Sequence, residues 1–145
     1  MIIRASLLSF LLVLSSCEPQ MTDEPIPWVA FPEVVLNLSL PENASLRLDG
    51  GIKEVNNAGV QGIIVYRVNP TTFRAYERTC SFQPSQAGST INVHSSRLYL
   101  TDFTCGSSFS LEEGIPTGGP AWRPLQQYRT VFANNMVTIT DETIN

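Results

Sequence analysis

Short runs of strand-forming residues, separated by turn signals, constrain the fold of this chain more than any other feature. No stretch after residue 33 keeps a helical period over several turns. Many short strands with Gly, Pro and Asn between them are typical of antiparallel sandwiches and barrels. We therefore expect an all-β domain. The predicted strands are Val34–Leu40, Gly62–Val68, Thr72–Thr79, Ile91–Val93, Arg97–Thr101, Gln127–Phe132 and Met136–Thr140.

Turn signals predict where these strands are connected. Asn69-Pro70-Thr71 separates two β-rich runs, and Asn134-Asn135 suits a tight hairpin because asparagine tolerates positive φ. Gly114–Pro124, rich in glycine and proline, is expected to be a loop. A length of 145 residues, 43% of them hydrophobic, is typical of one globular domain rather than a disordered chain.

The first 16 residues are expected to be a signal peptide rather than part of the fold. Arg4 precedes an apolar run, Ala5–Leu14, that is shorter than the roughly 20 residues needed to span a bilayer. Leu14-Ser15-Ser16-Cys17 resembles the lipobox of bacterial lipoproteins, in which the cysteine is lipidated. The resemblance implies an extracytoplasmic domain of the bacterial cell envelope, anchored to the membrane by lipid on Cys17. A plain secretory signal is the alternative.

The remaining residues divide into a tether and a domain. The prolines of residues 17–33 favour extended backbone, so this segment is predicted to be a lipid-anchored Pro-rich tether. Within it, Trp28, Val29 and Phe31 are expected to pack on the surface of the domain, which spans residues 34–145.

The charge of the chain argues against nucleic acid as a partner. Nine basic residues stand against thirteen acidic ones, for a net charge of −4, and Lys53 is the only lysine. Binding to nucleic acid needs clustered cations that displace counterions from phosphates. We therefore expect no nucleic-acid binding.

Two segments of the chain carry its most specific motifs. One ends in Cys80-Ser81-Phe82, and the other contains Cys105-Gly106-Ser107-Ser108-Phe109 and, further on, Gly119-Pro120-Ala121-Trp122-Arg123-Pro124-Leu125. Together they resemble the Rieske iron–sulfur domain, whose boxes are Cys-x-His, Cys-x-x-His-Gly-Ser-x-Phe and Gly-Pro-Ala-x-Arg-Pro-Leu. The resemblance implies a Rieske-like antiparallel sandwich or barrel of small sheets. A smaller, loop-rich module would carry Cys80 and Cys105.

The resemblance also implies four positions for cluster ligands. These positions are degenerate, because only one of them keeps the residue type that the family uses. A Rieske [2Fe–2S] cluster takes two cysteine thiolates and two histidine imidazoles. Cys80 matches the first cysteine, whereas Phe82 stands at the first histidine. Asp102 falls at the second cysteine and Cys105 at the second histidine. His94 is the only histidine, so two imidazoles are not available, and we expect no metal and no cofactor.

In the Rieske resemblance the loops of Cys80 and Cys105 meet, so we expect a disulfide between them in an oxidising compartment. A redox role for this pair is an open alternative, although the chain has no Cys-x-x-Cys motif. Trp122 is predicted either to cap the site or to contact a partner. The positions that the resemblance assigns to the cluster loops are Gly106, Ser107, Gly119, Pro120 and Trp122.

Other polar residues offer weaker candidates for chemistry. Glu112-Glu113 is better explained as a solvated turn than as an acid pair, and Ser107 and Ser108 have no histidine base near them in sequence. We therefore predict no catalytic residue. Arg123 could pair with either glutamate, and the sequence leaves that choice open.

These observations predict an envelope lipoprotein whose Rieske-like domain has lost its cluster ligands. It would act as a non-enzymatic binding or structural module, with the membrane and an unidentified protein as partners. The alternative is an electron-transfer protein that binds an atypically ligated [2Fe–2S] cluster. If the chain is redox-active, an iron–sulfur electron carrier is favoured over a hydrolase.

Overall fold

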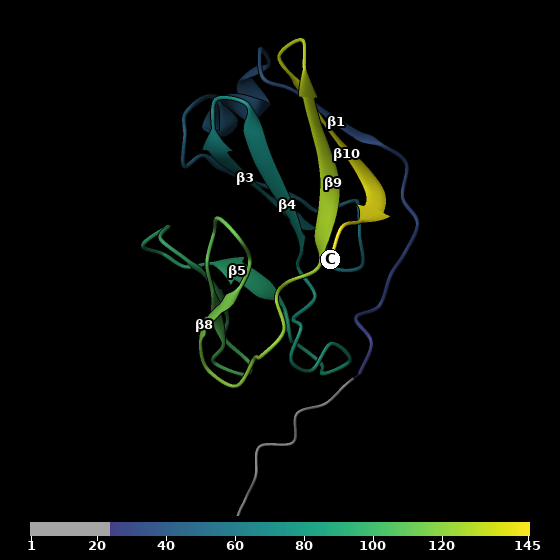
Figure 1. The fold of residues 1–145 in the computed structure, drawn as a ribbon, viewed down its shortest axis with the longest axis vertical. Helices are drawn as coiled ribbons and strands as arrows, with labels where there is room; N and C mark the ends of the chain where they lie inside the picture. The colour runs from purple at the N-terminus through teal and green to yellow at the C-terminus, as the bar shows by residue number, and fades with distance from the viewer. Residues whose placement is uncertain (1–23) are drawn as a thin grey trace, which may run out of the picture.

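The computed structural model describes residues 24–145, whose strands form two antiparallel sheets. The larger sheet has six strands in the order β1-β10-β9-β4-β3-β2, and the smaller has four in the order β5-β6-β7-β8. In Figure 1 the larger sheet lies above the smaller one. The predicted signal peptide and Cys17 lie outside the described residues.

The bounds of the elements are as follows. The strands are β1 (Val34–Asn37), β2 (Ile52–Val55), β3 (Ile63–Asn69), β4 (Thr72–Glu77), β5 (Ile91–Val93), β6 (Leu100–Asp102), β7 (Ser108–Phe109), β8 (Pro116–Gly118), β9 (Gln127–Ala133) and β10 (Met136–Thr143). One 3-10 helix, η1 (Pro41–Arg47), lies between β1 and β2.

The smaller sheet is an insertion into the larger one. All four of its strands lie between β4 and β9 in sequence, whereas β4 and β9 pair directly, with Ala75 opposite Tyr128. Cys80 follows β4 at the start of this insertion, and Cys105 lies between β6 and β7. The predicted all-β fold, with a smaller module carrying both cysteines, is confirmed.

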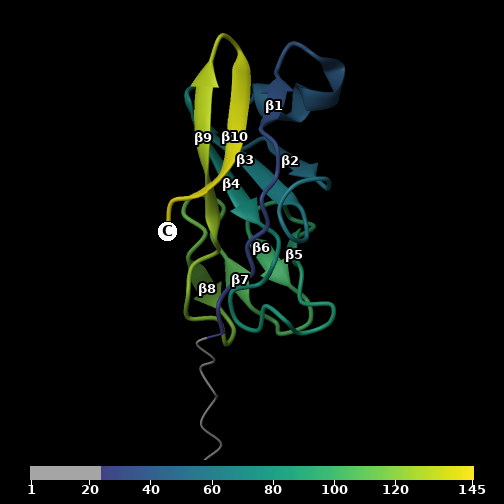
Figure 2. The same cartoon turned by 90° about the vertical axis from the view of Figure 1, so that its right-hand side faces the viewer.

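Local turn chemistry explains the two long hairpins of the larger sheet. Between β3 and β4, the Asn69 side-chain oxygen accepts hydrogen bonds from the backbone N–H groups of Thr71 and Thr72. Between β9 and β10, Asn134 and Asn135 have φ angles of 51° and 60°, the left-handed pair that a tight hairpin turn requires. Figure 2 shows this second hairpin projecting from the end of the sheet. Both predicted turns are confirmed.

Within the larger sheet, the first half of β3 is buried on both faces. Successive side chains of a strand point to opposite faces. Ile63 and Val65 enter one apolar cluster together with Leu46 of η1, whereas Ile64 enters a second cluster that extends into the smaller sheet. The second cluster consists of Ile52, Ile64, Tyr76, Cys80, Phe82, Ile91, Leu100, Phe109, Leu111, Ala121 and Leu125.

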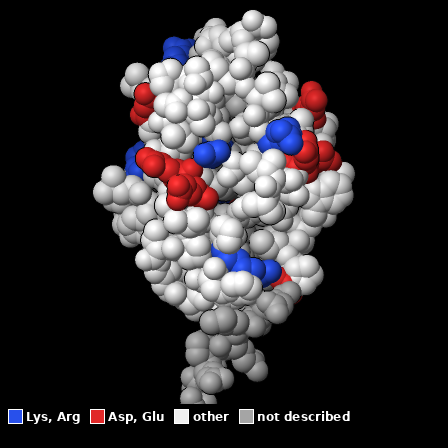
Figure 3. All heavy atoms as spheres, in the orientation of Figure 1, with Lys and Arg blue, Asp and Glu red and all other residues white. Residues whose placement is uncertain are grey.

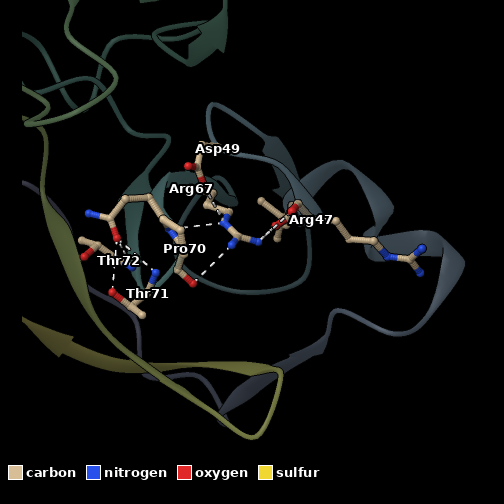
Figure 4. A network of polar contacts seen from close by, with 8 residues as sticks. Arg47, Asp49, Arg67, Pro70, Thr71 and Thr72 are labelled. Carbon is tan, nitrogen blue, oxygen red and sulfur yellow. Dashed lines mark hydrogen bonds and ion pairs between the residues drawn. The ribbon is translucent and has the colours of Figure 1, made fainter.

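Arg67 of β3 binds the carbonyl groups at the end of η1. Its guanidinium donates to the carbonyl oxygens of Leu46 and Arg47, both at 2.9 Å, and to that of Pro70 at 3.2 Å (Figure 4). It also pairs with Asp49 at 3.1 Å. Because an arginine offers five N–H donors in a fixed plane, one side chain satisfies several carbonyls where η1 ends.

Several local predictions were wrong. The strand predicted to Thr79 ends at Glu77, and the one predicted to Thr140 continues to Thr143. The first predicted strand ends at Asn37 rather than Leu40, because the Asn37 side-chain oxygen accepts from the Ser39 N–H and turns the chain. The predicted loop Gly114–Pro124 contains the strand β8. The strand predicted from Arg97 begins at Leu100, since Arg97 adopts a φ of 59° in the preceding turn. The helix η1 and the strand β2 were not predicted.

Residues 24–33 contain no helix or strand and run beside the domain to β1 (Figure 1). Phe31 packs edge-on against the Tyr128 ring, with centroids 5.0 Å apart, and Trp28 Nε1 donates to the Asp141 carbonyl at 2.8 Å. The predicted packing is therefore confirmed for Phe31, whereas Trp28 is 53% exposed and held by this hydrogen bond, and Val29 is 48% exposed. Among residues 24–145, no helix has the length and apolar character needed to cross a bilayer.

Charged side chains are mixed on the surface. On the face drawn in Figure 3, acidic and basic groups lie near one another in small clusters with uncharged surface between them. This face therefore has no basic patch of the kind that holds a phosphate backbone.

Candidate functional site

Two thiols and a carboxylate of the inserted segment lie close together. The Sγ atoms of Cys80 and Cys105 are 3.8 Å apart, and Cys105 Sγ is 3.5 Å from Oδ2 of Asp102. One ligand atom from each of the three residues lies within 4.8 Å of the other two. Cys80 and Asp102 are completely buried, whereas Cys105 is half-buried. We call these three residues the thiol–carboxylate cluster.

The loop after β6 is folded around Asp102. The Asp102 backbone N–H donates to the Ser107 carbonyl, and the Asp102 carbonyl accepts from Gly106, both at 2.9 Å. The Asp102 side-chain Oδ1 accepts from the Thr104 N–H at 2.7 Å. This tight turn places Cys105 beside the carboxylate. The turn also needs the left-handed conformation of Gly106, whose φ is 74°.

A second loop is bonded to the first through Ser107. Ser107 Oγ accepts from the Ala121 N–H at 3.1 Å and lies 3.1 Å from Cys105 Sγ. Gly119 lets the loops approach closely, because a Cβ there would lie 2.5 Å from the Ser107 Cα. Of the predicted loop residues, Gly106 and Ser107 therefore follow Cys105 directly, and Gly119 packs against both of them.

Reciprocal hydrogen bonds between Ser81 and Arg123 join the loop that contains Cys80 to the loop that contains Ala121. Ser81 Oγ donates to the Arg123 carbonyl at 2.7 Å, and the Arg123 guanidinium donates to the Ser81 carbonyl at 2.6 Å. Arg123 also donates to the Glu24 carbonyl at 2.7 Å. Among the ion pairs of residues 24–145, Arg123 pairs with neither Glu112 nor Glu113, the two partners that the sequence left open.

The site holds a buried anion beside at least one protonated thiol. Burial raises the pKa of the Cys80 thiol to about 12. Burial also opposes ionisation of Asp102, but hydrogen bonds from Ser89 Oγ and the Thr104 N–H outweigh it and hold the Asp102 pKa below its ordinary value. No ion pair among residues 24–145 includes Asp102. Its charge is therefore stabilised by dipoles alone.

The predicted disulfide is not formed in the structure. Cys80 and Cys105 are neighbours, as the Rieske resemblance implies, but both are free thiols. Their sulfurs are 3.8 Å apart, nearly twice the roughly 2.05 Å of an S–S bond. The sequence placed the two loops correctly, while the pairing state depends on side-chain positions within those loops.

His94 lies outside the thiol–carboxylate cluster. It follows β5 at the turn end of the β5–β6 hairpin, whereas Asp102 pairs with Ile91 at the other end. Its ring stacks on Tyr99 with centroids 4.2 Å apart, and Nδ1 bonds to Ser96 Oγ at 2.9 Å. These contacts place the His94 ring at the opposite end of the hairpin from Asp102.

The donor set does not fit a Rieske cluster. Such a cluster needs two thiolates and two imidazoles, and the three residues that converge here are Cys80, Asp102 and Cys105. Phe82, at the first histidine position, is 9% exposed and belongs to the second apolar cluster. A phenyl ring supplies no donor to iron.

The other predicted positions lie mostly on the surface. Glu112 and Glu113 are exposed, as expected for a solvated turn. Pro120 is also exposed, and Trp122 is 43% exposed outside the second apolar cluster, with the Arg123 guanidinium 5.4 Å from its ring centroid. Ala121, which is buried, belongs to that cluster. Of the two roles left open for Trp122, its exposure favours contact with a partner over capping of the site.

Sequence reasoning missed one buried carboxylate altogether. Glu77 ends β4 and is completely buried. Its oxygens accept from the backbone N–H groups of Val60, Gln61 and Thr79 and from the Tyr128 hydroxyl, at 2.8 to 3.0 Å. The single signal was an acidic residue at the end of an apolar strand, which is indistinguishable in sequence from a surface glutamate.

The arrangement of a base sheet with an inserted module that carries both cysteines is the one that the Rieske resemblance predicts. No protein-family model and no curated protein matches the sequence.

Several solved chains are similar to this one, including the following two. A chain of the complex of reduced oxygenase and oxidized ferredoxin in carbazole 1,9a-dioxygenase is 24% identical, with a TM-score of 0.47 over 67% of this chain and 86% of that one. The ferredoxin of carbazole 1,9a-dioxygenase from Nocardioides aromaticivorans IC177 is 16% identical, with a TM-score of 0.45 over 66% of this chain and 88% of that one. Likenesses at this level say nothing of this chain's activity.

Proposed function

We propose that this chain is a non-enzymatic binding module of the bacterial envelope that works without a Rieske cluster. The observation that carries the proposal is the residue set at the four ligand positions. Cys80, Asp102 and Cys105 converge, and the fourth position holds the apolar side chain of Phe82. Because a [2Fe–2S] centre of the Rieske kind needs two histidines, this set does not support one.

The loops around the thiol–carboxylate cluster also offer a surface for a protein partner. Phe103, in the loop that presents Cys105, is 72% exposed, and Trp122, in the facing loop, is 43% exposed. The two loops are joined by the bond between Ser107 Oγ and the Ala121 N–H. Exposed aromatic side chains on a rigid base are frequent anchors of protein interfaces. We expect the partner to be a protein that receives these two rings.

The expected absence of an iron–sulfur cluster is tested by the iron and sulfide content of the protein. The full-length protein is purified anaerobically, and its iron, acid-labile sulfide and visible absorption are measured. A colourless protein without stoichiometric sulfide is expected. A red-brown protein with about two irons and two sulfides per chain would contradict the proposal.

The second candidate function is electron transfer by an atypically ligated cluster. It is favoured because two thiols and a carboxylate, those of Cys80, Cys105 and Asp102, lie within 4.8 Å of one another. The same measurement separates the two functions, because a cluster contains inorganic sulfide and a binding module does not. Electron paramagnetic resonance of the reduced protein would then assign the ligands.

The envelope location rests on Cys17, and we include it in the proposal. Lipid on this residue would hold the domain at a membrane, with residues 18–33 as the spacer. In cells, the Cys17→Ser variant is expected to move from the membrane fraction to the soluble fraction and to lose the mass of the lipid. A Cys17→Ser variant that stays with the membrane would exclude lipid anchoring.

A further inference from the structure

We propose that Cys80, Cys105 and Asp102 bind one thiophilic divalent cation, for which Zn²⁺ is the representative. The proposal goes beyond a binding module, because it gives the thiol–carboxylate cluster a ligand of its own. It also differs from an iron–sulfur cluster, which would need a fourth protein ligand and inorganic sulfide. Three features support it, namely the spacing of the three side chains, the buried charge and the groups that orient the ligands.

Two of the three distances between the donor atoms match those around a tetrahedral metal, and the third is within 4.8 Å. A zinc ion about 2.3 Å from each sulfur, with tetrahedral angles, separates the two sulfurs by about 3.8 Å. With a carboxylate oxygen at about 2.1 Å, the expected sulfur-to-oxygen distance is about 3.6 Å. The structure has 3.8 Å between Cys80 Sγ and Cys105 Sγ, and 3.5 Å between Cys105 Sγ and Asp102 Oδ2. A disulfide does not explain this spacing.

A buried carboxylate at the site favours a cation. Asp102 is completely buried, and no ion pair among residues 24–145 includes it. Buried charges in proteins are normally paired or coordinate metals. Binding would release the thiol protons of Cys80 and Cys105 to solvent and leave two thiolates and a carboxylate around a doubly charged ion.

Neighbouring groups already hold the ligands in place. Ser89 Oγ donates to Asp102 Oδ2 at 2.8 Å, and the Thr104 N–H donates to Oδ1 at 2.7 Å, so the carboxylate has a fixed orientation. Ser107 Oγ lies 3.1 Å from Cys105 Sγ and is itself fixed by the Ala121 N–H. Such outer groups are typical of metal sites, where they orient ligands and raise affinity.

The fourth coordination position would be open to solvent. Cys80 and Asp102 are completely buried, whereas Cys105 is half-buried, so access is from the Cys105 side. Three protein ligands with a water in the fourth position form the open type of zinc site.

The test is a metal titration of the full-length protein, purified in detergent, reduced and stripped with a chelator. Zn²⁺ is titrated against a chromophoric chelator, and Co²⁺ is added as a spectroscopic probe. We expect one ion per chain and thiolate-to-cobalt charge-transfer absorption. Cys105→Ser and Asp102→Asn are expected to weaken binding by more than about 100-fold, and Ser89→Ala by roughly 10- to 100-fold.

Ser108→Ala is the matched control. Ser108 lies in the same segment, but its hydroxyl bonds to Thr117, not to the cluster, so affinity should be unchanged. Cys105→Ser alters a half-buried side chain, and circular dichroism verifies that the variant is folded. Equal affinity of folded Cys105→Ser and the unaltered chain would overturn the inference, as would the absence of Zn²⁺ and Co²⁺ binding.

Two further outcomes separate this inference from the proposed function. A protein isolated with two irons and two sulfides per chain would contradict both. A sulfide-free chain that binds neither ion, or one isolated with a Cys80–Cys105 bond that resists reduction, would contradict the metal site alone.

Discussion

The Tyr128 hydroxyl donates a 2.8 Å hydrogen bond to Oε2 of Glu77, and both side chains are completely buried. Glu77 ends β4, and Tyr128 lies in the neighbouring strand β9. The Glu77 carboxylate also accepts from the backbone of Val60, Gln61 and Thr79. It therefore ties the strand that leads into the insertion to the strand that leaves it, and to the loop before β3.

We predict that Glu77→Gln destabilises the domain by about 3 kcal/mol, because an amide –NH₂ would face N–H donors that now share a carboxylate. Urea unfolding measures the change. The matched control is Glu142→Gln at the exposed ion pair with Arg129, where no measurable shift of the midpoint is expected. Equal urea midpoints for the two variants would show that the buried hydrogen bonds of Glu77 do not stabilise the domain.

Gly119 and Gly106 form a second matched pair. Both have positive φ, 80° and 74°, but a Cβ at Gly119 would lie 2.5 Å from the Ser107 Cα, while Gly106 has open space. Gly119→Ala is expected to cost about 3 kcal/mol or more, and Gly106→Ala about 1 kcal/mol from the left-handed backbone alone. Thermal unfolding of both variants gives the comparison. A smaller effect at Gly119 than at Gly106 would contradict the close approach of the two loops.

Buried phenols predict a loss of stability in alkali. Burial raises the pKa of Tyr76, and burial together with the bond to Glu77 raises that of Tyr128. Both phenols therefore stay neutral in the fold, so their contribution is complete below the ordinary value of about 10 and declines as the pH rises above it. Urea midpoints from pH 8 to 11.5 would show the decline.

Tyr76→Phe is the control for this pH dependence. It keeps the ring but removes one titrating hydroxyl, together with its bond to the Leu111 carbonyl. The variant should be less stable at neutral pH and decline less steeply in alkali. An unaltered chain whose stability is flat from pH 9 to 11.5 would contradict the prediction.

Restoring the ligand set tests the positions assigned by the Rieske resemblance. Phe82→His, Asp102→Cys and Cys105→His, with Cys80 kept, recreate two thiolates and two imidazoles. After anaerobic reconstitution with iron and sulfide, the folded triple variant is expected to hold about two irons and to absorb visible light. The double variant that retains Phe82 lacks one imidazole and is expected to hold less. Failure of a folded triple variant to bind iron would mean that the assigned positions are wrong.

Local signals explain what was predicted correctly. The alternation in β3 and β4 and the turn at Asn69 depend on a few adjacent residues, and so does the left-handed pair Asn134 and Asn135. The motif order likewise placed Cys80 and Cys105 at facing loops. In contrast, η1 and β2 were missed because they depend on distant partners, such as the Arg67 guanidinium that binds the end of η1.

By itself, the sequence determined the all-β class, the two main hairpins and the shortage of histidine at the motif positions. The tertiary structure decided that Asp102 is buried against both thiols, that Ser89 orients it, and that the two sulfurs stand 3.8 Å apart without a bond. The physical reason is the range of the forces. Turn and strand preferences act between neighbouring residues, whereas a buried carboxylate and a sulfur-to-sulfur distance depend on three loops that meet only after the chain has folded.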